Sequence, residues 1–264
     1  MDLSACRAVP LTREARRPAA SVVRVRILAL TSPVFAATCY VVAADDGTCV
    51  VVDPGAGVAD DVARTVAAHG LRVAGVVVTH GHADHLWDAG AVAGLAGVPV
   101  RLHARDAYRV VDPLGSLGLG SADPTARALA DGLLAAVVGA GVDPAPPAVP
   151  EVVAFGADDD APRTGDVELE LGGVRLVARH APGHTEGSTL YLLDAGDEQV
   201  AFTGDVLFAG SVGRTDLPGG DPATMATTLR EVVAALPPGT HVLPGHGPAT
   251  RVDVELRTNP YLAG

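Results

Sequence analysis

Histidine and aspartate side chains gather in one short stretch of the chain, residues 79–85, which reads Thr-His-Gly-His-Ala-Asp-His. The valine-rich run 73–78 in front of it predicts a buried strand, so the polar stretch falls in the loop at the carboxyl end of that strand. His80 and His82 alternate along an extended loop and can face one cation, while Asp84 and His85 can face a second. Because imidazole and carboxylate groups are common metal ligands, this stretch predicts a metal site.

Three more residues of the same kind follow far downstream, each after a strand-like run and each beside glycine or proline. They are His184 in Pro-Gly-His-Thr, Asp205 in Thr-Gly-Asp and His246 in Pro-Gly-His-Gly-Pro. Glycine and proline turn the chain sharply at strand ends, and strand ends are where α/β sheets usually carry their chemistry. With these residues the candidate metal ligands number seven.

The pattern HxHxDH followed by a histidine, an aspartate and a histidine is similar to the signature of the metallo-β-lactamase superfamily. The resemblance extends over about residues 21–262. It implies an α/β fold, a four-layer αββα sandwich, with the ligands along the edge between the two halves. It also implies a dinuclear site in which one cation is held by His80, His82 and His184, the other by Asp84, His85 and His246, with Asp205 as the bridge.

The same resemblance implies roles for neighbouring residues and for the metals. Asp53 and Thr79 are expected to support the ligands from behind, although Asp53 could equally cap a turn. Two divalent cations, zinc in the first place with iron or manganese as alternatives, would lower the pKa of a shared water from 15.7 to about 7. The bridging hydroxide would attack an acyl carbon, and Asp84 would help to steer it or relay its proton.

Two residues narrow the reaction expected within the superfamily. Asp205 disfavours antibiotic hydrolysis, because classical β-lactamases of the superfamily usually lack a bridging aspartate. His82 disfavours diiron oxygen reductases, which carry glutamate at that position. The segment 207–216 and the Asn-Pro-Tyr-Leu sequence at 259–262 resemble short bacterial glyoxalase II-like proteins, which hydrolyse thioesters such as hydroxyacyl-glutathione. We therefore expect a metallo-hydrolase that acts on a small-molecule thioester.

The sequence is compatible with more than one thiol as the carrier of the acyl group. In full-length glyoxalase II a lysine and a tyrosine stand at the places of Arg214 and Asp216 and touch the thiol cofactor. Arg214 keeps a positive charge that could bind a substrate carboxylate, but it could equally form an ion pair with Asp216. A low-molecular-weight thiol other than glutathione is therefore an alternative carrier.

Three other functions are compatible with parts of this pattern. The Gly-Arg-Thr-Asp sequence at 213–216 also occurs in persulfide dioxygenases of the same fold, which use one iron and oxygen. A lactonase could work with the same ligands. A non-catalytic metal-binding scaffold would have no need for a complete set of ligands, and all seven are present.

Composition excludes other classes of function. The 264-residue chain is 48% apolar, has a formal charge of −12 and contains no lysine, so a nucleic-acid binder is disfavoured. No apolar run is long enough to predict a membrane span. The three cysteines, Cys6, Cys39 and Cys49, lack paired spacing, which favours a reducing cytoplasm, and Cys39 and Cys49 read as buried apolar filler. The oligomeric state cannot be derived from this pattern.

The chain is expected to form one domain over residues 21–264 behind a disordered leader, residues 1–20. A helical insertion at about 106–150 separates the two ligand-bearing halves and could either cover the mouth of the site or pack at the periphery. His69, His103, His180 and His241 lack the Gly/Pro context of the ligand histidines and are read as ordinary, with His103 partly exposed at a strand end.

Periodicity and turn residues predict the elements around these residues. Helices are expected at 58–69, at 85–95 with Asp84 as its N-cap, at 124–140, and at 222–235 with Asp221 as its N-cap and Pro222 in its first turn. Strands are expected at 22–30, 37–43, 48–52, 73–78, 98–102, 167–171, 174–179, 190–193, 200–203 and 240–243, with a turn at 45–47 joining the second and third.

Overall fold

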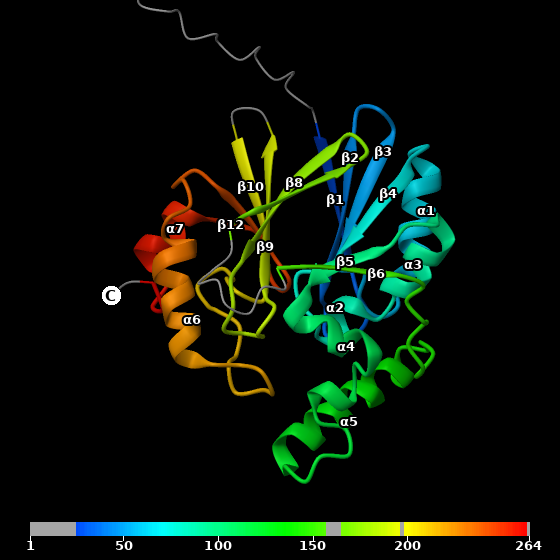
Figure 1. Cartoon of the computed structure of the whole chain (residues 1–264), viewed down its shortest axis with the longest axis vertical. Helices are drawn as coiled ribbons and strands as arrows, with labels where there is room; N and C mark the ends of the chain where they lie inside the picture. Colours follow the sequence, from blue (N-terminus) through cyan, green and yellow to red (C-terminus); the bar gives the residue numbers. More distant parts are fainter. Residues whose placement is uncertain (1–24, 157–164, 196–197, 263–264) are drawn as a thin grey trace, which may run out of the picture.

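Two six-stranded sheets form the centre of the protein, as seen in a computed structural model that describes residues 25–156, 165–195 and 198–262 (Figure 1). The first sheet holds its strands in chain order: β1 (Val25–Thr31), β2 (Thr38–Ala44), β3 (Thr48–Val52), β4 (Arg72–Val77), β5 (Val100–His103) and β6 (Val152–Phe155). Strands β1 to β3 pair antiparallel, and β3 to β6 pair parallel. Parallel pairing needs crossover connections, and the helices of this half supply them.

The second sheet has the spatial order β12-β11-β10-β9-β8-β7. Its strands are β7 (Val167–Leu171), β8 (Val174–His180), β9 (Thr189–Ala195), β10 (Glu198–Gly204), β11 (His241–Pro244) and β12 (Thr250–Arg251). Only β10 and β11 pair parallel, and the helical segment between them is the crossover. Candidate ligands stand after strand ends in both sheets, which brings distant parts of the sequence to one edge.

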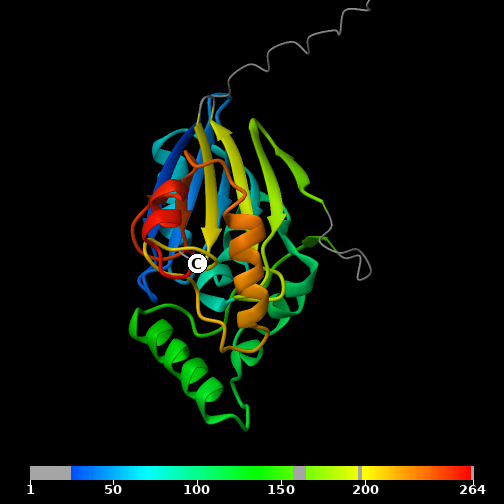
Figure 2. The same ribbon diagram turned by 90° about the vertical axis from the view of Figure 1, so that its left-hand side faces the viewer.

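Helices cover the outer face of each sheet. The first sheet is covered by α1 (Ala59–Ala68) and α3 (Ala89–Ala96), and the second by α6 (Pro222–Thr228), which continues into a π-helical turn, η3 (Leu229–Val233), and by α7 (Val252–Thr258). Figure 2 shows these layers from the side of α6. An apolar core that includes Val50, Leu176 and Phe202 fills the space between the sheets. The expected four-layer αββα sandwich is therefore confirmed.

The insertion holds most of the remaining helices. It consists of η1 (Ala104–Asp106), α4 (Ala107–Val111), η2 (Gly115–Leu117) and α5 (Pro124–Gly139). Asp123 caps α5 by accepting hydrogen bonds from the Thr125 and Ala126 N–H groups. A separate apolar cluster holds Leu117 and Leu133 of the insertion against Trp87 of the sandwich. The insertion is thus packed onto the sandwich near the first group of candidate ligands.

The prediction of one continuous helix at 85–95 is wrong, both in where the helix begins and in its being unbroken. The structure has two helices instead, α2 (Ala83–Leu86) and α3, and Asp84 lies in the first turn of α2 without capping it. The break has a physical cause at Asp88, whose N–H donates to the Pro54 carbonyl and whose carboxylate accepts from the Ala59 N–H at the start of α1. These long-range bonds replace the intrahelical ones.

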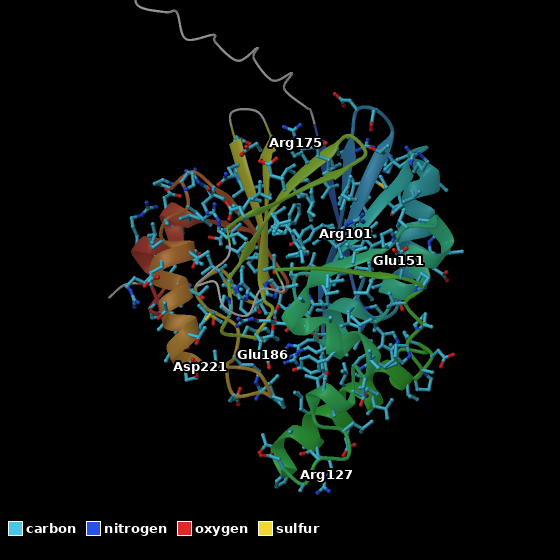
Figure 3. The ribbon with its side chains drawn as sticks, in the orientation of Figure 1. Arg101, Arg127, Glu151, Arg175, Glu186 and Asp221 are labelled. Atoms are coloured by element: carbon cyan, nitrogen blue, oxygen red, sulfur yellow. The ribbon has the colours of Figure 1, made fainter. Side chains whose placement is uncertain are left out.

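Several other predictions are confirmed, and four short elements were not predicted. Asp221 caps α6, whose position at the edge of the second half is visible in Figure 3, and Pro222 occupies the first turn. Cys39 and Cys49 are buried and free, as expected. The sequence did not indicate β6, β12, α4 or α7, which are short and lack periodicity. The leader at 1–20, with Cys6, and the expected start of the first strand at 22–24 lie outside the described residues.

Candidate metal centre

The seven candidate ligands converge at one edge of the sandwich, from both sheets. His80 and His82 come from the loop after β4, Asp84 and His85 from α2 that follows, and the others from the loops after β8, β10 and β11. Ligand atoms lie within 4.8 Å of one another in three groups of three. These groups are His80, His82 and His184; His80, His85 and Asp205; and Asp84, His85 and His246.

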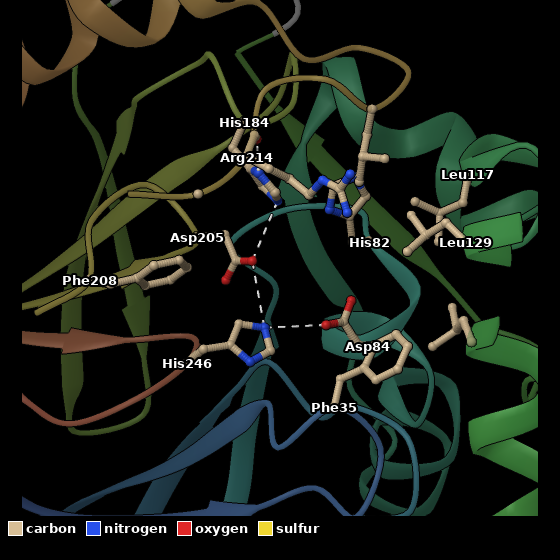
Figure 4. Close-up of a pocket in the computed structure, with 13 residues that line it drawn as sticks. Phe35, His82, Asp84, Leu117, Leu129, His184, Asp205, Phe208, Arg214 and His246 are labelled. Carbon is tan, nitrogen blue, oxygen red and sulfur yellow. Dashed lines mark hydrogen bonds and ion pairs between the residues drawn. The ribbon is translucent and has the colours of Figure 1, made fainter. Parts of the chain in front are cut away.

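Asp205 lies between the two histidine-rich groups. Its Oδ1 is 3.3 Å from His85 Nε2, and its Oδ2 is 3.6 Å from the Nε2 atoms of His184 and His246. On the far side, Asp84 Oδ2 lies 3.3 Å from His246 Nε2 (Figure 4). Two carboxylates thus face the imidazole nitrogens from the open side of the cluster.

Hydrogen bonds behind the imidazoles fix which nitrogen points inward. His184 Nδ1 donates to the Arg214 carbonyl at 2.7 Å, and His85 Nδ1 donates to the Asp53 carboxylate at 3.1 Å. The Thr79 hydroxyl gives its only proton to Asp53 at 2.7 Å, so at 3.1 Å it accepts from His80 Nδ1. Each neutral ring therefore presents an Nε2 lone pair to the centre of the cluster.

The Nε2 atoms lie close to one another at the centre of the cluster. His80 Nε2 and His184 Nε2 are 3.2 Å apart, and His85 Nε2 and His246 Nε2 are also 3.2 Å apart. His82 Nε2 and Asp205 Oδ1 are buried without a hydrogen-bond partner among the described residues. The facing Nε2 acceptors of His80 and His184 repel each other unless a cation lies between them, so the donor set fits divalent metal ions.

The pKa shifts in the cluster follow from burial and from the neighbouring charges. Burial, assisted by the neighbouring imidazoles, holds the pKa of His80 and of His82 well below the ordinary value. Burial alone would raise the pKa of Asp205, but His85 and the other imidazoles hold it below the ordinary value. Burial also lowers the pKa of His85, but the Asp205 and Asp84 carboxylates raise it well above the ordinary value. Metal binding requires neutral imidazoles beside ionised carboxylates, so a cation bound at His85 would displace a proton from that ring.

Asp53 and Thr79 lie directly behind the cluster. Asp53 accepts from the Thr79 N–H at 2.6 Å, from the Thr79 hydroxyl and from His85, and its backbone has φ 51°, which is uncommon for a residue other than glycine. An outlier that is held by three hydrogen bonds marks a site where the chain tolerates strain. The geometry therefore suits the supporting role expected of both residues.

Family comparison agrees with the fold and with this cluster. The family model described as "Metallo-beta-lactamase superfamily" matches residues 32–246. The chain belongs to the metallo-β-lactamase superfamily. The resemblance expected from the pattern of histidines and aspartates is thereby confirmed.

Curated relatives within the superfamily include hydrolases. The chain is 33% identical to "Probable metallo-hydrolase YqgX" of Bacillus subtilis over 228 residues, which cover 86% of this chain and 93% of that protein. It is 29% identical to "Hydroxyacylglutathione hydrolase GloC" of Haemophilus influenzae, with the same shares of the two chains covered. The assignment to a metallo-hydrolase family is shown by these matches.

Solved structures show the same fold. The BLEG-1 B3 metallo-β-lactamase aligns with a TM-score of 0.71 and 28% identity, covering 90% of this chain and all of that one. TTHA1623, solved in a di-iron-bound form, aligns with a TM-score of 0.65 and 29% identity, covering 89% of this chain and all of that one. A protein of similar fold has thus been solved in a di-iron-bound form.

A pocket of about 240 Å³ opens beside the cluster. Its lining includes five of the candidate ligands together with Arg214, and leucines from η2 and α5. Arg214 makes a two-pronged ion pair with Asp216, at 2.7 and 2.8 Å, so both roles weighed for Arg214 are compatible with its position. Of the two alternatives for the insertion, the one at the mouth of the site agrees with this lining.

Two buried residues near the site were not selected from the sequence. Asp106, at the root of the insertion, accepts from the Gly81 N–H at 2.7 Å, from the Thr185 hydroxyl at 2.7 Å and from the Gly187 N–H at 2.8 Å. It therefore ties the loop of His80 and His82 to the loop of His184. Arg109, also fully buried, donates to Glu186 and to the Pro218 carbonyl. An Asp and an Arg three residues apart after a strand end were the only available hint.

His103 differs from the expectation. It is 2% exposed, whereas a partly exposed side chain was expected, because it stacks on His180 of the other sheet at 4.0 Å between ring centroids. Its Nδ1 accepts from the Arg105 N–H at 3.3 Å. It lies outside the groups of candidate ligands, as predicted.

The structure also bears on membrane association. Among the described residues, none of the helices is long and apolar enough to cross a bilayer.

Proposed function

We propose that the protein is a thioester hydrolase that uses two divalent cations, zinc in the first place. The observation that carries this proposal is the convergence of imidazole nitrogens and carboxylate oxygens into three groups, one of which contains Asp205. We assign one cation to His80, His82 and His184 and the other to Asp84, His85 and His246, with Asp205 shared. The similarity to a hydroxyacylglutathione hydrolase supports a thioester as the substrate class.

Two such cations, when bound, supply Lewis acidity toward an acyl oxygen and acidify a water molecule. The chain's own residues then determine the geometry of the reaction. Asp53, Thr79 and the Arg214 carbonyl hold three imidazoles with their Nε2 atoms directed inward. This positioning avoids reorganisation during the reaction, which is a general source of catalytic rate.

Asp84 is the residue to which we assign proton handling. Burial would raise its pKa, but His85 and the hydrogen bond with His246 lower it, so the carboxylate is ionised at neutral pH and can accept a proton from water. In the overall reaction a water oxygen bonds to the acyl carbon, the carbon–sulfur bond breaks, and a proton from water reaches the departing thiolate. Arg214, in the lining of the pocket, is assigned to the thiol part of the substrate.

The test is a substrate panel for the full chain loaded with zinc, compared with the same protein after chelation. Hydrolysis of thioesters that is lost on chelation and restored by zinc is the expected result. The panel also holds lactones and a β-lactam, and a parallel assay measures oxygen uptake with a persulfide and iron. Turnover confined to lactones or to the β-lactam, or persulfide-dependent oxygen uptake without thioester hydrolysis, would contradict the proposal.

A further inference from the structure

The pocket beside the candidate metal centre has two chemically distinct sides. One side is formed by candidate ligands, and the other is apolar, formed by Phe35, Leu117, Leu129, Leu133, Phe208 and Leu217. In Figure 4 Leu117 and Leu129 lie on the side of His82, and Phe35 lies beside Asp84. Arg214 is the guanidinium in this lining, and Asp216 already pairs with it through both carboxylate oxygens.

The apolar side contributed by the insertion is preformed. Leu117 is 3% exposed and Leu133 is 1% exposed, because both also belong to the cluster that contains Trp87 and Leu217. Side chains held in a packed cluster cannot turn away to expose a polar group. An apolar substrate group therefore binds favourably against this apolar wall of Leu117 and Leu133. A hydroxyl placed there would lose its hydrogen bonds to water.

Phe35 extends this wall to the mouth of the pocket. Its side chain is 46% exposed, and both Phe35 and Ala36 have φ 54°, which residues other than glycine rarely adopt. Ser32 pins the turn, since its N–H donates to the Ala37 carbonyl and its hydroxyl donates to the Ala56 carbonyl. An exposed aromatic ring held by a strained backbone beside a reactive site indicates a contact with a ligand.

We propose that the acyl group of the substrate is an apolar chain of about four to eight carbons that lies against Leu117, Leu129, Leu133 and Phe35. This inference rests on the proposed thioester hydrolase. The pocket volume sets an upper limit on this size, because an apolar cavity of about 150 Å³ holds benzene and the whole pocket, including the side of the candidate ligands, has about 240 Å³. The acyl carbon would then lie on the side of Asp84 and Asp205, and the thiol would leave toward Arg214.

The first experiment measures kcat/KM of the full, zinc-loaded chain on thioesters of one neutral thiol, N-acetylcysteamine. The acyl group runs from acetyl to octanoyl, and propanoyl is compared with lactoyl, which differs from it by one hydroxyl. Because each buried methylene is worth about a three- to fourfold change in transition-state binding, kcat/KM is expected to rise at least tenfold from acetyl to hexanoyl. Propanoyl is expected to exceed lactoyl. Equal rates for acetyl and hexanoyl, or a preference for lactoyl, would overturn the inference.

A pair of variants on α5 tests the wall itself. Leu129 lines the pocket, while Leu134 packs against the same cluster with a similar partial exposure and does not line it. Leu129→Ser is expected to lower the hexanoyl-to-acetyl ratio of kcat/KM at least threefold, and Leu134→Ser is expected to leave that ratio unchanged. A Leu129→Ser variant that keeps the wild-type ratio would contradict the proposed contact.

A binding measurement separates this inference from the proposed reaction. Calorimetry with straight-chain carboxylates from acetate to octanoate, on the zinc-loaded chain, needs no turnover. An affinity that rises with chain length and falls in Leu129→Ser supports the apolar site, even if no thioester is hydrolysed and the proposed reaction is wrong. An affinity that is independent of chain length overturns the apolar site, whatever the enzyme hydrolyses.

Discussion

At the scale of single residues, the candidate metal centre depends on what lies behind each ligand as much as on the ligands. Asp53 serves His85 and Thr79 together, and the Thr79 hydroxyl in turn orients His80. One carboxylate therefore sets the direction of two imidazoles, one from the loop after β4 and one from α2. Hydrogen-bond partners of this kind commonly change metal affinity by about 10–100-fold.

Gly245 offers a sharp test of how closely the backbone approaches the cluster. A Cβ atom there would overlap Asp205 Oδ1 and would lie 2.6 Å from His85 Cε1. The backbone cannot easily retreat, because the Gly245 N–H donates to the Gly204 carbonyl and the Gly245 carbonyl accepts from the Thr38 N–H. Gly245→Ala is therefore expected to displace Asp205 and to weaken zinc binding at least tenfold, as measured by competition with a chromophoric chelator.

The matched control for this change is Gly239→Ala, since no atom lies within 4 Å of a Cβ built there and its backbone is not left-handed. This variant should bind zinc like the wild type. Undiminished zinc affinity in Gly245→Ala would show that Asp205 does not lie at the metals.

At the scale of elements, Asp106 connects the loops that carry the first group of ligands. Both of its carboxylate oxygens accept from backbone N–H groups, one from Gly81 and the other from Gly187. In Asp106→Asn an amide NH₂ must face one of these donors. We expect a loss of about 1–3 kcal/mol in the free energy of unfolding, measured in urea, together with weaker zinc binding.

Asp112→Asn is the control for this prediction. Asp112 lies in the same insertion but is exposed and accepts from the Gly115 N–H. Little change in stability or zinc affinity is expected from it. If Asp106→Asn were as stable and bound zinc as tightly as Asp112→Asn, the connecting role of Asp106 would be wrong.

Local sequence predicts a feature of this protein only where the contacts that define the feature are also local. The candidate ligands could be selected from the sequence because each is marked locally, by its neighbours and by the strand before it. Asp106 could not, because its role comes from bonds to Thr185 and Gly187, about eighty positions away. The break between α2 and α3 was missed for the same reason, since the partners of Asp88 belong to another part of the chain.

At the scale of the whole molecule, the stack of His103 and His180 joins the two sheets beside the site. His103 is in β5 and His180 is in β8, with ring planes 8° apart. Burial, together with His180 and Arg105, lowers the pKa of His103 to about 3. A neutral ring is therefore part of the folded state, and its Nδ1 must stay free to accept from the Arg105 N–H.

This stack predicts a pH dependence of stability. An unfolded histidine has a pKa of about 6.5, so the unfolded chain binds one more proton than the folded chain between pH 6.5 and 3. The stabilisation is complete above pH 6.5 and is lost as the pH falls, with a slope that approaches about 1.4 kcal/mol per pH unit. Urea unfolding at pH 7, 6 and 5 is expected to show a shallower decline in His103→Phe than in the wild type.

Identical slopes in the wild type and in His103→Phe would mean that His103 accepts a proton readily in the folded protein. The stack would then not be the neutral contact that its burial indicates.

The proposed hydrolysis depends on a cluster that holds two cations. The most direct measurement is elemental mass spectrometry of the full chain, purified without chelators from zinc-supplemented cells, with the metal content expressed per chain. A site for two cations predicts two equivalents of divalent metal per chain, with zinc the main component. One equivalent or less, unchanged when Asp84, His85 or His246 is replaced by alanine, would contradict it.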